Sequence, residues 1–167
     1  MKPVLSLVGL TALALGLLVS GSASGGGVLP SVVGSGDFTA AVPRHITITA
    51  VSGPEGVIGQ ITVKLTTTPA TTIIADVTCL YVQGNRAVVG SVVTFDSTNP
   101  ALIGAPVMHA FVDNGAASDP TPDQRSAPRF VTGGPPTQSD CESAFPTEFT
   151  TLFPIDPGNV TVNAGAA

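Results

Sequence analysis

Apolar and polar side chains alternate along short segments of this chain, and glycines and prolines separate these segments. Between Gly59 and Thr66, glycine or apolar residues occupy one phase and polar residues the other, and residues 45–50 alternate in the same way. This period of two is typical of half-buried β-strands. The fifteen prolines cannot lie inside central strands, so they indicate the ends of elements. We expect an all-β fold, an antiparallel β-sandwich or small barrel of about six to eight strands.

The chain begins with the features of a secretory signal peptide. Lys2 supplies a positive charge, an apolar run extends from Val4 to Val19, and small residues follow up to Ser24. We expect residues 1–24 to be removed by cleavage after Ala23 or Ser24 and the protein to be secreted. The alternative is an uncleaved anchor, but the run is short for a membrane span and contains two glycines. We expect no membrane insertion after the leader is removed.

The remaining chain has the length of one domain. Residues 25–43 are rich in small side chains, and we expect a flexible lead-in there. Residues 44–167 should form a single β domain. Within it, the segment from Ala116 to Pro157 contains eight prolines and should be mostly irregular, with short ordered pieces at 130–131 and 149–153. Residues 159–163 alternate again and should form the edge of a sheet.

Residues 73–83 and 86–95 are expected to form a β-hairpin. Gly84-Asn85 separates them, and a two-residue loop that starts with glycine favours a type II′ turn. The resulting register pairs Gln83 with Arg86, Val82 with Ala87, Leu80 with Val89, Cys79 with Gly90 and Val77 with Val92. A glycine opposite a cysteine leaves room for another chain segment to approach. Because both faces of this hairpin are largely apolar, we expect loops to cover its outer face.

Two cysteines, Cys79 and Cys141, are present. In an exported protein they are expected to form one disulfide, and the alternative is a pair of buried thiols. Cys79 lies on a core strand and Cys141 in the proline-rich segment. The disulfide should therefore hold that segment against the hairpin.

Charge and composition exclude several classes of partner. Six Lys and Arg residues stand against eleven Asp and Glu residues, and after the leader the basic ones are dispersed at Arg44, Lys64, Arg86, Arg125 and Arg129. Nucleic acids and anionic membranes need clustered positive charge, so we expect neither as a partner. The chain has no Trp and one Tyr, Tyr81, which gives little support to sugar recognition by exposed aromatic residues.

The acidic segment Asp113, Asp119 and Asp123 is the strongest candidate for a ligand site. Calcium binds clustered carboxylates on bent loops, but the spacing matches no EF-hand. Asp113-Asn114-Gly115 is also typical of an ordinary Asx turn, which is the expectation we favour.

Other combinations of reactive residues are weaker. His45 lies on the polar phase of its strand and His109 shares a phase with Val107 and Phe111, so a metal or acid–base site would need distant strands to meet. Asp140 and Glu142 flank Cys141, and on a strand-like segment they would share an exposed face. We therefore assign no catalytic, cofactor or metal residue and expect no cofactor.

Several motifs together resemble a known family. They are VTCLYVQGNRA at 77–87, VDNG at 112–115, PD at 122–123, Cys141, and GNVTV at 158–162. Their order is similar to that in small uncharacterised secreted bacterial β-domain proteins, and the GN-A and DNG pieces are similar to the post-COAP domain. The resemblance extends over residues 45–163 and implies a β fold without an activity. The proline-rich part from Ala116 to Pro136 departs from the post-COAP pattern.

Three classes of function are compatible with these expectations. The first is an exported non-enzymatic domain that acts by structural or adhesive surface contact with a protein or glycan, because no cluster of titratable residues is visible. The second is a small-molecule or glycan binding module that uses a sandwich edge or a barrel mouth. The third is a hydrolase or isomerase whose site forms only in the fold, for example where His45 or His109 meets Asp113 or Asp123.

Overall fold

A computed structural model describes residues 28–145 and 148–166, so the expected signal peptide at 1–24 lies outside the described residues. The long strands are β1 (Ser31–Thr39), β2 (Pro43–Gly53), β3 (Gly56–Leu65), β4 (Thr71–Gln83), β5 (Arg86–Asp96), β6 (Pro106–Val112) and β10 (Gly158–Asn163). The short elements are the 3-10 helix η1 (Pro100–Leu102), β7 (Gln124–Ser126), β8 (Arg129–Phe130), the helix α1 (Gln138–Ala144) and β9 (Leu152–Pro154).

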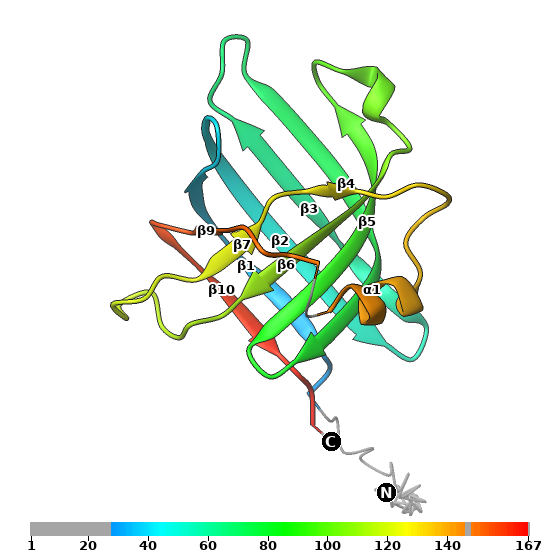
Figure 1. Ribbon diagram of the computed structural model, residues 1–167, viewed down its shortest axis with the longest axis vertical. Helices are drawn as coiled ribbons and strands as arrows, with labels where there is room; N and C mark the ends of the chain where they lie inside the picture. Colours follow the sequence, from blue (N-terminus) through cyan, green and yellow to red (C-terminus); the bar gives the residue numbers. More distant parts are fainter. Residues whose placement is uncertain (1–27, 146–147, 167) are drawn as a thin grey trace, which may run out of the picture.

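The strands form one antiparallel sheet that curls into a half-barrel (Figure 1). Its order is β10-β1-β2-β3-β4-β5-β6-β7-β9, with β8 paired to β6. The expected all-β antiparallel fold is confirmed, and the sheet curls around one interior instead of dividing into two layers. The described residues contain ten strands, more than expected, because Ser31–Thr39 is also a strand and because β7, β8 and β9 are too short to show a period of two.

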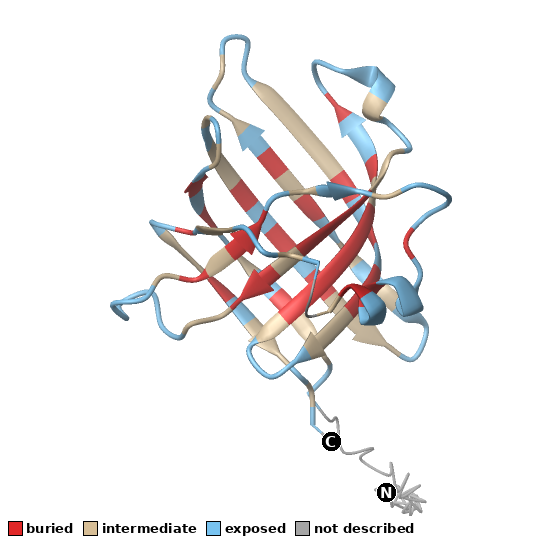
Figure 2. Cartoon of the chain, viewed as in Figure 1, coloured by how far each residue is buried: buried red, intermediate tan, exposed pale blue. Residues whose placement is uncertain are grey.

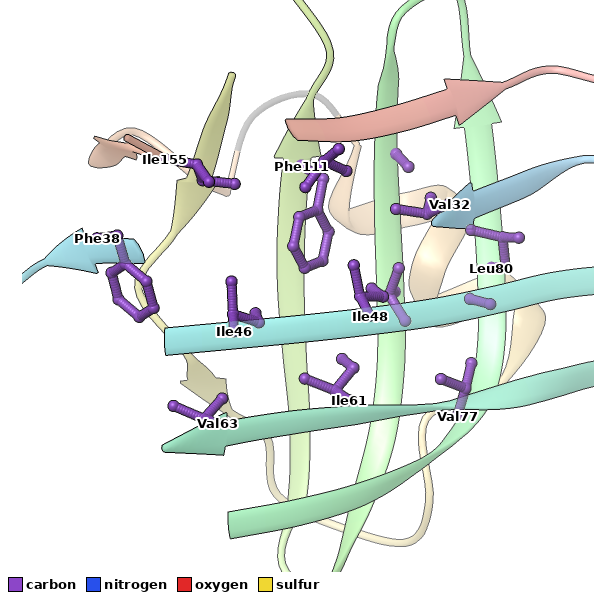
Figure 3. Close-up of a cluster of buried hydrophobic side chains, with 14 residues drawn as sticks. Val32, Phe38, Ile46, Ile48, Ile61, Val63, Val77, Leu80, Phe111 and Ile155 are labelled. Carbon is purple, nitrogen blue, oxygen red and sulfur yellow. The ribbon is translucent and has the colours of Figure 1, made fainter. Parts of the chain in front are cut away.

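The concave side of the sheet contains the main core. Buried and exposed residues alternate along β2 and β3, as the bands in Figure 2 show, while β5 and β6 are buried on both faces. Figure 3 shows the side chains from several strands that point toward one another inside the half-barrel, including Ile46, Ile48, Ile61, Leu80 and Phe111. These residues are almost fully buried. Burial of their apolar surface holds the curled sheet around its interior.

The β4–β5 hairpin has the expected turn, and most of the expected register is confirmed. Gly84 has a φ of +62° while Asn85 does not have a positive φ, as a type II′ turn requires. Four of the expected pairs are present, from Gln83–Arg86 to Cys79–Gly90. The expected Val77–Val92 pair is wrong: a bulge between Val77 and Cys79 pairs Val77 with Ser91. The extra residue turns Val77 into the interior core instead of toward the outer face.

The disulfide between Cys79 and Cys141 is present and holds a cover on the outer face of the hairpin. Pro136 lies over Gly90, where an added Cβ would approach the Pro136 Cβ to 2.6 Å. The Thr78 hydroxyl donates a hydrogen bond to the Pro136 carbonyl oxygen (2.8 Å). The expected close approach of another segment at the cysteine–glycine pair is therefore confirmed. A second apolar cluster of Cys79, Val88, Met108, Cys141 and Ala144 fills the space beneath this cover.

Residues 138–144 form the helix α1 rather than the expected strand-like segment. Thr137 caps the helix: its side chain accepts a hydrogen bond from the Asp140 N–H, and the Asp140 carboxylate accepts one from the Thr137 N–H. This capping box satisfies two backbone donors that would otherwise lack partners. Its sequence signature, a threonine followed three residues later by an acid, is readable at 137–140.

The expected flexible lead-in at 25–43 is wrong over its described part, because Ser31–Thr39 forms β1 between β10 and β2. The small residues that suggest flexibility have a packing role. A Cβ on Gly34 would lie 2.2 Å from the Asn159 carbonyl oxygen, and one on Gly36 would lie 2.3 Å from the Ile155 side chain. These glycines let β10 and the segment before it approach β1 closely.

Two carboxylates of the loop between β6 and β7 join it to the edge strand β10, near the other edge of the curled sheet. The Asp123 carboxylate, just before β7, accepts hydrogen bonds from the Val160 N–H of β10 (2.6 Å) and from the Asn114 N–H (2.7 Å). The Asp113 carboxylate, just after β6, accepts one from the Val162 N–H (2.9 Å). The expected edge strand at 159–163 is confirmed as part of β10, and these side chains satisfy N–H groups on its free side.

Removal of the disulfide tests how far the cover depends on it. In the loop-entropy account, a bridge across 62 residues of sequence stabilises the fold by about 4 kcal/mol. We expect the double variant Cys79→Ala/Cys141→Ala to lose about that much free energy of unfolding in urea titrations. Equal stability of the variant and the oxidised wild type would contradict this role.

The junction of the sheet edges is tested by Asp123→Asn. The amide removes the charge and one acceptor from a buried site, so we expect a loss of about 2 kcal/mol in the free energy of unfolding. Asp119→Asn, on the exposed part of the same loop, is the matched control and should lose less than about 1 kcal/mol. If the two variants unfold at the same urea concentration as the wild type, Asp123 does not hold the edges together.

Candidate functional site

The half-barrel contains a cavity of about 70 Å³ at the end where β2, β4 and β6 begin and β3 and β5 end. This is the upper end in Figure 1, beside the β3–β4 connection and η1. The apolar lining comes from Ile61, Val63, Ile73, Ala75, Val93, Leu102, Val107, Pro128 and Phe130. Arg44, His109 and Arg125 supply the polar lining. A largely apolar cavity with a few converging polar groups is the usual form of a small-molecule site.

Arg125 is the most unusual residue in this lining, because its side chain is only 1% exposed. It lies on β7, paired with Phe111 of β6, which turns it into the half-barrel. Its Nε donates a hydrogen bond to the Ser126 carbonyl oxygen (2.9 Å), and its Nη2 lies 2.7 Å from His109 Nδ1. Its guanidinium carbon lies 4.3 Å from the centre of the Phe38 ring. These contacts fix the plane of the guanidinium group.

His109 is the hydrogen-bond acceptor in its contact with Arg125. A guanidinium group can only donate, so Nδ1 must be unprotonated and the ring neutral, with its proton on Nε2. Burial, and then the positive charge of Arg125, hold the pKa of His109 well below its ordinary value. His109 therefore positions Arg125 without adding a second charge.

Arg44 brings a second guanidinium group to the same cavity. It begins the inward-facing series of β2 that continues through Ile46 and Ile48. Its guanidinium carbon lies 6.0 Å from the centre of the Phe38 ring, so both arginines lie near the same aromatic ring. Burial and the positive charge of Arg44 lower the pKa of Arg125 to about 9.

No described carboxylate forms an ion pair with either arginine. The ion pairs among residues 28–145 and 148–166 are His45 with Asp37 and Arg129 with Glu148. Arg125 Nη1 and Arg44 Nε are buried and have no hydrogen-bond partner in this part of the protein. The cavity thus has two guanidinium groups at one side and apolar walls elsewhere.

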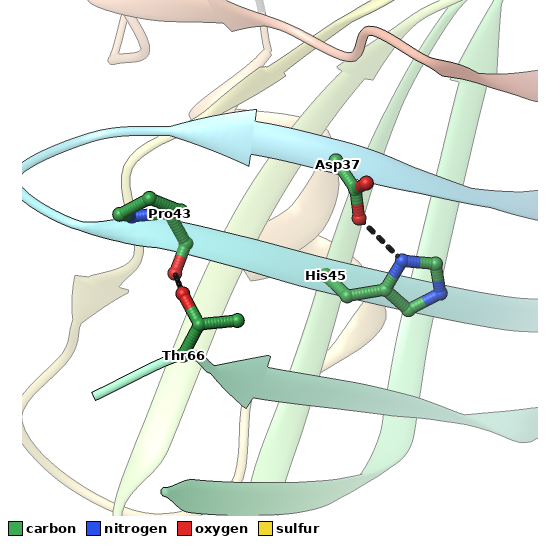
Figure 4. A network of polar contacts seen from close by, with 4 residues as sticks. All are labelled: Asp37, Pro43, His45 and Thr66. Carbon is green, nitrogen blue, oxygen red and sulfur yellow. Dashed lines mark hydrogen bonds and ion pairs between the residues drawn. The ribbon is translucent and has the colours of Figure 1, made fainter. Parts of the chain in front are cut away.

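His45 lies outside this site. It stands on the outer face of the sheet, half exposed, with Nδ1 2.6 Å from an Asp37 carboxylate oxygen of β1 (Figure 4). The same view shows the Thr66 hydroxyl donating to the Pro43 carbonyl oxygen (3.1 Å) across β2 and β3. The two histidines are thus on opposite faces of the sheet, and each has its own partner.

The acidic segment is structural. The Asp113 carboxylate accepts a hydrogen bond from the Gly115 N–H (2.9 Å), which confirms the expected Asx turn. Asp119 accepts one from the Ala116 N–H (2.8 Å), and Asp123 accepts hydrogen bonds from backbone N–H groups of its own loop and of β10. Among the described residues, no group of three or more His, Cys, Asp or Glu side chains is placed to hold a metal ion.

Neither histidine meets Asp113 or Asp123, which is the arrangement that would have favoured a hydrolase or isomerase. Asp140 is engaged in the cap of α1, where the side-chain and backbone hydrogen bonds of Thr137 lower its pKa. Glu142 accepts a hydrogen bond from the Gln138 side chain on the same helix (3.1 Å). These acids stabilise local structure on the outside of the protein.

Sequence reasoning missed the two arginines of the cavity. A signal for Arg44 was present, because it shares the inward phase of Ile46, Ile48 and Ala50. Arg125 had none, because β7 contains three residues and lies in a segment expected to be irregular. His109 was placed correctly on the phase of Val107 and Phe111, but its partner could not be read from the sequence.

Comparisons of the chain with protein-family models, with curated proteins and with solved structures return no match. The resemblance to the post-COAP domain therefore stays a prediction. Among the described residues, no helix is long and apolar enough to cross a membrane.

The neutral state of His109 predicts how stability depends on pH. Its pKa is lowered in the folded protein, so below about pH 6.5 the unfolded chain binds a proton that the folded protein does not. Stability should therefore fall with falling pH, by up to about 1.4 kcal/mol between pH 7.5 and pH 5.5. His109→Gln keeps an acceptor for Arg125 and should lack this fall in urea titrations.

His45→Gln is the matched control, since His45 is half exposed on the other face, and it should keep the fall. A His109→Gln variant with the same pH dependence as the wild type would show that His109 is not neutral in the fold.

Proposed function

We propose that this protein is an exported small-molecule-binding domain that holds an apolar ligand inside the open end of its half-barrel. The observation that carries the proposal is the cavity lined by inward-facing residues of β3, β4, β5 and β6. A dry cavity of about 150 Å³ holds a benzene molecule, so about 70 Å³ takes only part of a short chain or a small ring, and the rest of the ligand would lie toward the open end of the half-barrel. Preformed apolar cavities with a few polar groups are the usual sites of small ligands, and most of them are several times larger.

The position of the cavity supports binding rather than surface contact. Most of its lining residues lie on paired strands and face the interior, so the ordered sheet presets the shape of the site. Phe130 also lines the cavity and is 54% exposed, which places an apolar side chain between the interior and solvent. The expectation of a structural or adhesive surface role stays a prediction.

The polar lining supports binding rather than hydrolysis. Arg44, His109 and Arg125 are the titratable residues that line the cavity, and the histidine is held as an acceptor for Arg125. The described part of this lining contains no carboxylate and no serine, threonine or cysteine. General acid–base or nucleophilic chemistry would need such a group beside the histidine.

Export is the second part of the proposal. The apolar leader at 1–24 supports it. The Cys79–Cys141 disulfide fits an oxidising compartment outside the cytosol. An exported binding domain would meet its ligand in the surrounding medium.

A larger side chain that fills the cavity tests whether ligands bind there. Val93 faces the cavity and Val92, the next residue on β5, faces the other side and is half buried. We would measure the melting temperature of the wild type, Val93→Phe and Val92→Phe with hexan-1-ol, hexanoate, benzyl alcohol and benzoate. A ligand at ten times its Kd stabilises by about 1.4 kcal/mol, which raises the melting temperature of a domain of this size by about 3–5 °C.

We expect at least one of these compounds to raise the melting temperature of the wild type and of Val92→Phe but not that of Val93→Phe. Absence of a rise in the wild type with all four would contradict the proposal. An equal rise in Val93→Phe would place the binding outside the cavity and would contradict it too.

A further inference from the structure

We infer that the ligand of this cavity is an organic monoanion, a carboxylate on an apolar body, which Arg125 binds with help from Arg44. The inference rests on the proposed binding function and assigns the chemical class of the ligand. Its basis is a guanidinium group that the protein buries and orients but does not neutralise.

The first observation is that no described side chain neutralises the charge of Arg125. Burial of a charge in a protein interior is costly unless the charge is paired. Arg125 is 1% exposed, and its described polar partners are a neutral histidine and a backbone carbonyl. Arg44 adds positive charge instead of compensating it. An anion at this position would supply the compensation that the described residues do not.

The second step is orientation. The Ser126 carbonyl fixes Nε, His109 fixes Nη2, and the Phe38 ring lies against the face of the group at 4.3 Å. The remaining nitrogen, Nη1, has no partner among the described residues. A donor held in place in this way binds an anion without the cost of ordering a flexible side chain. A hydrogen bond between two charged groups is also about twice as strong as a neutral one.

The third step is the selection of an apolar monoanion. The walls opposite the arginines are aliphatic, with Ile61, Val63, Ile73, Ala75 and Val93 among them. Inorganic phosphate or sulfate would lose its hydration there without gaining polar partners on those sides. A carboxylate on an alkyl or aryl body places its charge at Arg125 and its carbon atoms against the aliphatic walls. A single charge suffices because Arg44 is partly exposed to solvent and is therefore screened.

The low pKa of Arg125 gives this pairing a signature. The titratable groups that face it are Arg44 from β2 and His109 from β6. A pKa lowered to about 9 predicts that Arg125 loses part of its charge above pH 9. Carboxylate affinity should then fall above pH 9, while the affinity for a neutral analogue of the same shape should not.

The experiment compares matched probes on matched variants by titration calorimetry. Hexanoate is paired with hexan-1-ol and benzoate with benzyl alcohol, and inorganic phosphate tests charge alone. The variants are Arg125→Met, which keeps an apolar side chain without the charge, and Arg86→Met, which removes an arginine at the far end of β5. Circular dichroism and urea titration follow the fold of each variant.

We expect the wild type to bind a carboxylate at least about tenfold more tightly than its alcohol and to bind phosphate more weakly than either carboxylate. Arg125→Met should lose that preference, keep the affinity for the alcohol within about twofold, and be no less stable than the wild type. Arg86→Met should keep the preference.

Equal affinity of the wild type for carboxylate and alcohol would overturn this inference and leave the proposed binding function in place. Equal affinity for phosphate and hexanoate would also overturn the inference. A marked loss of stability in Arg125→Met would overturn it too, because it would show that the arginine has a structural role. If the wild type binds none of the organic probes, the proposed function itself fails.

Discussion

The carboxylate of Asp123 joins the loop before β7 to the edge strand β10, and this contact helps to close the curled sheet around its interior. The chain runs from β9, at one edge, directly into β10, at the other. An open edge leaves a row of unpaired backbone N–H groups. Here Asp123 and Asp113 accept hydrogen bonds from two N–H groups of β10. Side chains thus supply the acceptors that a neighbouring strand would otherwise provide. The glycines of β1 let β10 lie close enough for this contact.

This closure gives the half-barrel two different ends. Toward the β4–β5 turn the interior is filled by packed aliphatic residues and Phe111. Toward η1 the same inward-facing rows continue, but they surround a cavity with two arginines at its side. Phe38 lies in both regions, since it belongs to the core and contacts both guanidinium groups. The packed end thus provides the stability that allows the other end to contain an unpaired buried charge. Proteins commonly accept such local cost at sites that bind ligands.

Regular patterns in the sequence predicted the long strands well. The alternation in β2 and β3, the Gly84-Asn85 turn, and the pairing of Cys79 with Gly90 each follow from local rules, and the structure confirms them. The prediction of a flexible lead-in at 25–43 was wrong, because glycines that allow close packing resemble the glycines of a flexible segment. The predicted partner of Val77 was wrong, because a bulge shifts the strand pairing by one residue and leaves no signal in the sequence. Arg125 could not be found, because its burial depends on the path of a three-residue strand within a proline-rich segment.

The central claim is that the buried, oriented guanidinium group of Arg125, at the side of an apolar cavity, binds the carboxylate of a ligand. A crystal structure of the protein with bound hexanoate tests it most directly. The account predicts a carboxylate oxygen within hydrogen-bond distance of Arg125 Nη1, with the alkyl chain between the residues of β3, β4 and β5. Hexanoate bound on the outer face, or lying in the cavity with its carboxylate directed away from both arginines, would contradict it.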